Sequence, residues 1–124
     1  MARILIVEDS PANMQLFSIV LESDGHTLLG AERAQTGIEL AREHVPDLIL
    51  MDIQLPGMDG VTALGLLRAD PRTRAIPVAA LTAYAMKGDR EKLLASGFNA
   101  YIEKPIDYVT FLQQVTALIT RSAI

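Results

Sequence analysis

The sequence contains several short, unbroken runs of apolar residues, most of which end at a polar side chain. The clearest are 4–7 (Ile-Leu-Ile-Val), 48–51 (Leu-Ile-Leu-Met) and 77–81 (Pro-Val-Ala-Ala-Leu), and weaker runs lie at 27–29 and 100–102. Apolar runs that do not alternate with polar residues are typical of strands buried on both faces. The pattern therefore predicts a parallel sheet with helices on both sides.

Segments with helical periodicity separate these runs. Ser10 followed by Pro11 is a typical helix start, because serine caps free backbone N–H groups and proline fits the first turn. Gly25 and Gly97 suit helix ends. Further helices are expected at 36–43, 61–67, 86–95 and 108–119. The alternation predicts an α/β fold of (βα)₅ order, a three-layer αβα sandwich.

Composition limits the classes of function. A chain of 124 residues, 50% of them hydrophobic, fits a single domain spanning 1–124. The absence of cysteine excludes disulfides and thiolate chemistry. A net charge of −4 with 5% aromatic residues argues against direct nucleic-acid binding. We find no signal peptide or membrane-spanning segment, and we expect a cytoplasmic protein without membrane association.

Polar side chains follow the predicted strands at one edge of the sheet. They are Glu8 and Asp9 after the first strand, Asp52 after the third, Thr82 after the fourth and Lys104 after the fifth. In the strand order 2-1-3-4-5 the first and third strands are neighbours, so the three carboxylates should converge. Their repulsion requires a proton or a cation, and Mg²⁺ prefers oxygen ligands of this kind.

Donor groups complete this predicted site. Lys104 is long enough to reach across the fourth strand toward Asp52. We expect the hydroxyl of Thr82 and the backbone N–H of Ala83 to face the same space. Carboxylates, a metal ion, an ammonium and a hydroxyl suit phosphoryl transfer, in which positioning and charge neutralisation supply most of the catalysis. We expect Asp52, the central carboxylate, to be the nucleophile.

The motifs around these residues resemble the receiver domain of two-component response regulators. The matching stretches are 6–10 (Ile-Val-Glu-Asp-Ser), 50–60 (Leu-Met-Asp-Ile-Gln-Leu-Pro-Gly-Met-Asp-Gly), 80–83 (Ala-Leu-Thr-Ala) and 101–105 (Tyr-Ile-Glu-Lys-Pro). The stretch 82–89 is closest in pattern to DivK-like single-domain regulators and to receivers of hybrid histidine kinases. The resemblance covers essentially the whole chain and implies a flavodoxin-like fold with a parallel sheet of order 2-1-3-4-5.

The resemblance implies a phosphoacceptor and a metal site. Asp52 would accept a phosphoryl group from a phosphohistidine of a histidine kinase or a histidine phosphotransfer protein. Asp9, Asp52 and the backbone carbonyl of Gln54 would bind Mg²⁺ or Mn²⁺ directly, and Glu8 would bind it through water. Glu8 stands where the family more often has aspartate, so its longer side chain would alter the water positions around the ion.

The resemblance also implies a conformational switch. Lys104 would bind a phosphate oxygen, and the peptide bond before Pro105 would be cis. Thr82 and the N–H of Ala83 would contact the phosphate, and Tyr101 would turn inward behind Thr82. The fourth helix, fifth strand and fifth helix would then form the surface for a downstream protein target. The protein would be a monomer or a weak homodimer.

Three other functions fit the sequence less well. A Mg²⁺-dependent aspartyl-phosphate phosphatase needs an acid two residues after the nucleophile, and Gln54 stands there. A nucleotide- or flavin-binding module needs a glycine-rich phosphate loop, which is absent. A receiver kept only for docking would not need the complete set of active-site residues. We expect a stand-alone receiver that catalyses its own phosphorylation and dephosphorylation and is otherwise no enzyme; the alternative is a receiver excised from a longer response regulator or hybrid kinase.

Overall fold

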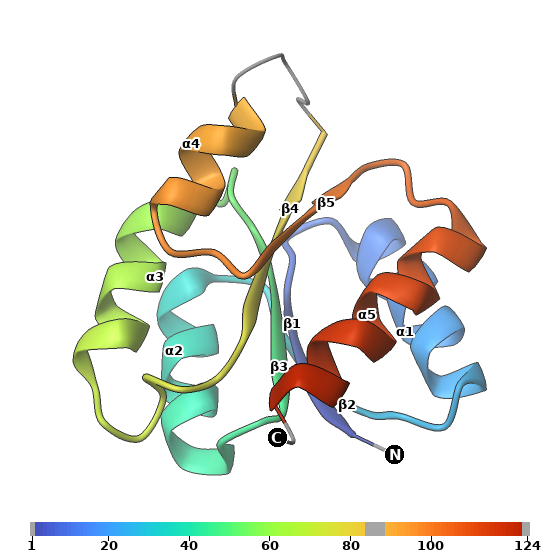
Figure 1. Cartoon of the computed structure of the whole chain (residues 1–124), viewed down its shortest axis with the longest axis horizontal. Coiled ribbons are helices and arrows are strands. Elements are labelled where there is room, and N and C mark those ends of the chain that lie inside the picture. Colours follow the sequence, from blue (N-terminus) through green and yellow to red (C-terminus); the bar gives the residue numbers. More distant parts are fainter. Residues whose placement is uncertain (1, 84–88, 123–124) are drawn as a thin grey trace.

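The computed structural model describes residues 2–83 and 89–122, which form a parallel sheet between two layers of helices (Figure 1). The strands are β1 (Arg3–Val7), β2 (Thr27–Ala31), β3 (Leu48–Asp52), β4 (Val78–Thr82) and β5 (Ala100–Glu103). They are ordered β2-β1-β3-β4-β5, and each neighbouring pair is parallel. The predicted three-layer α/β fold of flavodoxin-like type is confirmed, and so is the predicted strand order.

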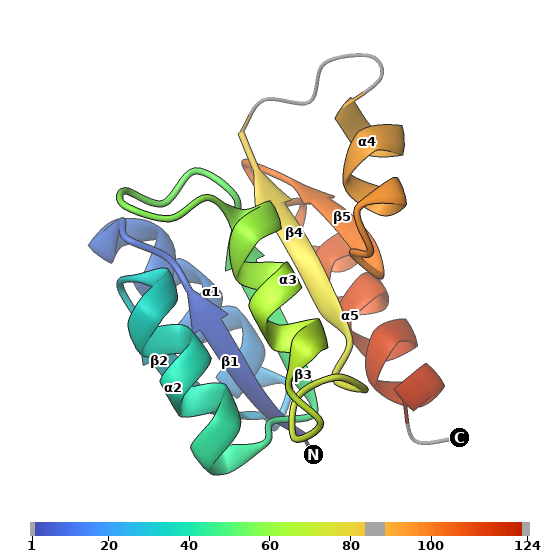
Figure 2. The same ribbon diagram turned by 90° about the vertical axis from the view of Figure 1, so that its left-hand side faces the viewer.

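The helices divide between the two faces of the sheet. They are α1 (Pro11–Ser23), α2 (Ala34–His44), α3 (Gly60–Ala69), α4 (Asp89–Ala95) and α5 (Tyr108–Ser122). Helices α1 and α5 cover one face, and α2, α3 and α4 cover the other (Figures 1 and 2). The fourth helix was predicted from 86, and residues 86–88 lie outside the described residues. Among the described helices, none has both the length and the apolar content that a membrane span requires.

The predicted helix ends are borne out by local geometry. The side chain of Ser10 accepts a hydrogen bond from the N–H of Asn13, and Pro11 lies in the first turn of α1. Gly25 and Gly97 both have positive φ, 88° and 111°. Glycine adopts this left-handed conformation without the steric penalty that a Cβ brings.

The unbroken apolar runs are explained by burial on both faces of the sheet. Every residue of β3 and β4 is buried. In β1, Leu5 and Val7 pack toward α2 and α3, whereas Ile4 and Ile6 pack toward α1 and α5. Each such side chain contributes roughly 1.5–3 kcal/mol when it leaves water. The sheet is therefore a fixed frame for the polar side chains at its carboxyl edge.

The chain makes a close approach between β3 and α3. Asp59 caps α3 by accepting a hydrogen bond from the N–H of Thr62, and Gly60 is the first residue of the helix. A Cβ on Gly60 would lie 2.8 Å from Cα of Ile53, the residue after Asp52. The absence of a side chain at Gly60 thus lets α3 begin directly beside the loop that carries Asp52.

We predict opposite effects for the same substitution at two glycines of α3. Gly60→Ala should lower the free energy of unfolding by about 1–3 kcal/mol, because the backbone of Ile53 must move. Gly65→Ala should raise it by about 0.5–1 kcal/mol, because a Cβ there meets no atom within 4 Å beyond the nearby backbone of its own helix, and alanine favours helix. Urea unfolding measures both. Equal effects at the two positions would contradict the close approach.

Candidate functional site

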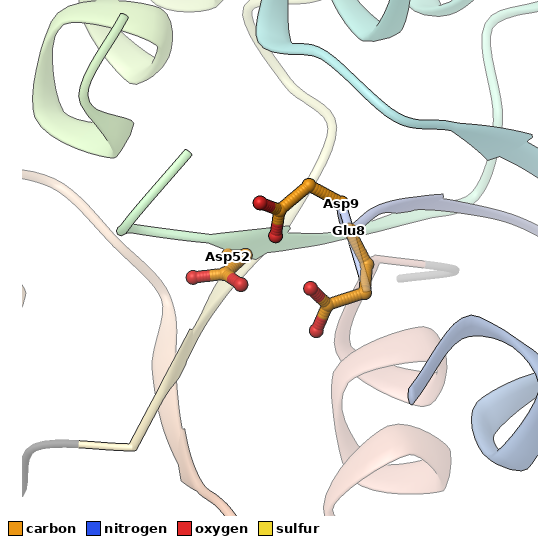
Figure 3. Close-up of side chains that lie close together, drawn as sticks. All are labelled: Glu8, Asp9 and Asp52. Carbon is orange, nitrogen blue, oxygen red and sulfur yellow. The ribbon is translucent and has the colours of Figure 1, made fainter. Parts of the chain in front are cut away.

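Three carboxylates gather where β1 and β3 end (Figure 3). Glu8 and Asp9 follow β1, and Asp52 is the last residue of β3, the strand paired with β1. One oxygen of each carboxylate lies within 4.8 Å of the others. Glu8 and Asp52 are buried, whereas Asp9 is exposed. The predicted convergence is confirmed, and the set of oxygen donors fits a divalent cation reached from the Asp9 side.

Lys104 supplies the positive charge of the site. Its Nζ donates a hydrogen bond to Oε1 of Glu8 and another, of 2.9 Å, to Oδ2 of Asp52. The side chain starts after β5 and crosses β4 to reach them, as its length predicted. Its backbone N–H bonds to the carbonyl of Thr82 at 2.7 Å, and the following bond to Pro105 is cis, as expected.

The pairing with Glu8 was not predicted, because the sequence indicated Asp52 as the partner of Lys104. Glu8 has one more methylene than aspartate, which lets one oxygen reach Lys104 while Oε2 accepts the N–H of Ser10 at 3.2 Å. On Asp52, Oδ1 accepts the N–H of Gln54 at 2.8 Å. Each buried carboxylate is thus held by one backbone N–H and by the shared ammonium. The role of the Gln54 carbonyl as a metal ligand stays a prediction.

The buried groups shift one another's protonation. Burial raises the pKa of Glu8, and the charge of Asp52 adds to this rise, although the hydrogen bond from Lys104 opposes it. Burial alone would lower the pKa of Lys104, but its hydrogen bonds to Asp52 and Glu8 outweigh burial and raise that pKa. Lys104 is therefore charged. The cluster has three carboxylates and one ammonium, which contacts two of them, so a bound cation would neutralise the excess negative charge.

The remaining predicted residues lie at the same edge or just below it. Thr82 ends β4 and is fully buried, and Ala83 follows it and is exposed. Tyr101 is half-buried on β5 opposite Ala80, two residues before Thr82. Because side chains two residues apart on a strand share a face, Tyr101 and Thr82 lie on the same side of the sheet, the side covered by α2, α3 and α4. This placement is compatible with the predicted switch.

Comparison with known proteins agrees with this geometry. The family model of the response regulator receiver domain matches residues 4–116. The polar-differentiation response regulator DivK of Brucella anthropi is 45% identical over 112 residues, which are 90% of this chain and 91% of that protein. DivK of Brucella abortus matches to the same extent.

Solved receiver structures have the same fold. The receiver domain of the sensor histidine kinase PA1611 from Pseudomonas aeruginosa has a TM-score of 0.88 and 34% identity over 96% of this chain and 98% of that one. That structure holds a magnesium ion in its active-site cleft. The receiver domain of a histidine kinase from Syntrophus aciditrophicus has a TM-score of 0.87 and 31% identity, and covers 97% of this chain and 91% of that one. The chain belongs to the response regulator receiver family and takes part in two-component phosphorelay signalling.

Proposed function

We propose that Asp52 is the phosphoacceptor and that Mg²⁺ binds directly to Asp9, Asp52 and the carbonyl of Gln54, and through water to Glu8. The observation that carries this assignment is the environment of Asp52, whose two oxygens are oriented by the Gln54 N–H and the Lys104 ammonium. The magnesium ion in the cleft of the PA1611 receiver supports the choice of metal. Mn²⁺ accepts the same oxygen ligands and is the alternative ion.

The proposed reaction transfers the phosphoryl group between two protein side chains. A carboxylate oxygen of Asp52 forms a bond to phosphorus while the bond from phosphorus to the imidazole nitrogen of a phosphohistidine breaks. The bound cation supplies charge neutralisation at the phosphoryl oxygens. Lys104, the hydroxyl of Thr82 and the N–H of Ala83 donate to these oxygens and fix their position. The receiver catalyses this transfer and the later hydrolysis on itself, and acts on no other substrate.

In the proposed function, phosphorylation changes which protein the receiver binds. A histidine kinase or histidine phosphotransfer protein donates the phosphoryl group, and a downstream protein binds the face formed by α4, β5 and α5. Thr82 and Tyr101 support this choice, because they lie on one side of the sheet next to that face. The chain acts as a single receiver domain over 1–124, in the cytoplasm, as a monomer or weak homodimer and without direct contact to nucleic acid.

The aspartyl-phosphate phosphatase alternative is not favoured. Such an enzyme places a general acid two residues after its nucleophile, and Gln54 cannot donate or accept a proton in that role. The N–H of this residue instead holds Asp52.

Asp52→Asn should abolish phosphorylation. With Mg²⁺ and a small phosphodonor, the unaltered protein should gain the mass of one phosphoryl group and the variant should gain none. Asp59→Asn is the matched control: it replaces a nearby carboxylate that caps α3, a role that asparagine also fills. Intact-protein mass spectrometry reads both variants. A phosphoryl gain in Asp52→Asn would remove Asp52 from its proposed role.

Lys104→Ala should strengthen Mg²⁺ binding. Its ammonium bonds to two of the proposed metal-binding carboxylates, Glu8 and Asp52, and removing a charged hydrogen-bonding group changes binding by about tenfold. Calorimetric titration with Mg²⁺ measures the effect. Lys92→Ala, which removes the same charge from an exposed position of α4, should leave Mg²⁺ affinity unchanged. Weaker binding in Lys104→Ala would show that Lys104 does not compete with the cation.

Thr82→Val should separate phosphorylation from the switch. Valine keeps the shape of threonine but lacks the hydroxyl, so the variant should still gain a phosphoryl group. Loss of a hydrogen bond to a charged group, about 1.5–3 kcal/mol, should shift the population back toward the unswitched state by about tenfold or more. The phosphorylation-induced NMR shift change at Tyr101 reports this population. A change as large as in the unaltered protein would exclude the Thr82 hydroxyl from the switch.

A further inference from the structure

Arg68, near the end of α3, donates hydrogen bonds to segments far apart in the sequence. Its Nη1 donates to the carbonyls of Arg74 at 3.1 Å and Ile76 at 2.6 Å, in the connection that leads to β4. Its Nη2 donates to the carbonyl of Gly97 at 3.3 Å and to Oδ1 of Asn99 at 2.7 Å, in the turn between α4 and β5. One side chain thus joins both connections.

The acceptors of Arg68 are neutral oxygens. Among the ion pairs of the described residues, none involves Arg68. The planar guanidinium presents its N–H groups in a fixed fork, so acceptors on both sides are held in one geometry. The arrangement therefore fixes positions and does not neutralise an acid.

Asn99 extends this connection into the sheet. Its Oδ1, which accepts from Arg68, also accepts the backbone N–H of Val78 at 2.9 Å. The N–H of Asn99 in turn donates to the carbonyl of Val78 at 2.8 Å. The end of α3, the start of β4 and the turn after α4 are consequently tied together around one amide oxygen.

This cluster lies at the base of α4, on the edge of the sheet opposite the phosphoacceptor. Helix α4 lies beside β5 on the face that α3 also covers (Figure 2). It lies between the end of β4, next to the site, and the start of β5, so its C-terminal end is the distant one. Leu93 and Phe98 are buried in the core at that end, and Gly97 closes the helix with φ 111°.

We propose that Arg68 anchors the base of α4, so that α4 pivots about the turn 97–99 when its other end responds to the phosphoryl group. The anchoring is a property of the resting protein. The pivot rests on the proposed function, since it requires that phosphorylation moves the Thr82 end. A helix held at its C-terminal end by the core and by the Arg68 fork can tilt about that end while its base stays in register with β4 and β5.

Amide hydrogen exchange of the unphosphorylated chain tests the anchor. Arg68→Gln should speed exchange of the amides at 93–99 by about tenfold, because the bonds to the turn are charge-assisted. Arg74→Gln is the matched control: it removes the same charge nearby, and its Nε donates only to the carbonyl of Arg68, at 3.3 Å, among the described contacts. Exchange at 93–99 should stay within about twofold of the unaltered protein in that control.

Two further variants separate anchoring from general stability. Arg68→Lys keeps the charge but lacks the fork, so it should show most of the acceleration; exchange like that of the unaltered protein would overturn the anchor. Asn99→Ala removes one acceptor and should accelerate the same segment if Arg68→Gln is too unstable to measure. Acceleration spread equally over β1, β3 and 93–99 would also overturn the anchor, because it reports global unfolding.

The pivot is tested with Mg²⁺ and a small phosphodonor. In the unaltered protein, phosphorylation should change amide exchange less at the C-terminal end of α4 than at its N-terminal end. In Arg68→Gln, the change should extend through 97–99. An identical pattern in both would overturn the pivot. A chain that gains no phosphoryl mass would count against the proposed function, while the exchange result on the resting protein would still decide the anchor.

Discussion

The site depends on one ammonium shared between two buried carboxylates. Glu8 and Asp52 are almost completely shielded from water, and an unpaired ion in such surroundings costs several kcal/mol. Lys104 offsets this cost for both of them at once. The acids lie at the ends of β1 and β3, and the lysine follows β5, two strands away from β3, so the strand order brings them together. The charge balance of the site therefore depends directly on the topology of the sheet.

The sheet makes that constraint rigid. Its central strands are buried on both faces, so neither β1 nor β3 can shift along its neighbour without moving apolar side chains out of two separate clusters. The loops after these strands supply backbone N–H groups from Ser10 and Gln54 that hold the carboxylates. Gly60 lets α3 begin against the second of these loops. Apolar packing thus fixes the backbone positions of Glu8 and Asp52, and the polar contacts orient their carboxylates.

Much of this could be predicted from the sequence, because it depends on patterns that repeat or on polar residues at strand ends. Unbroken apolar runs predicted the strands, and Ser10-Pro11 predicted the start of α1. The start of α2 was predicted two residues late, because its N-cap, Arg33, makes no side-chain capping bond that a sequence pattern would reveal. Arg68 was not predicted either. Its acceptors are mostly backbone carbonyls, which every residue carries, so no choice of side chain marks them in the sequence.

The shared lysine also links the metal to the phosphoryl group. If Asp52 is phosphorylated as proposed, the new oxygens compete for the ammonium that Glu8 and Asp52 hold in the resting state. When Lys104 turns toward the phosphoryl group, Glu8 loses its ion-pair partner while it is still buried, and the raised pKa of Glu8 shows that burial already disfavours its charge. A cation at the carboxylates compensates for that loss. In the proposed mechanism, a bound cation would therefore favour the phosphorylated state, and phosphorylation would favour cation binding to the same extent, because the cation replaces the charge that Glu8 loses with Lys104.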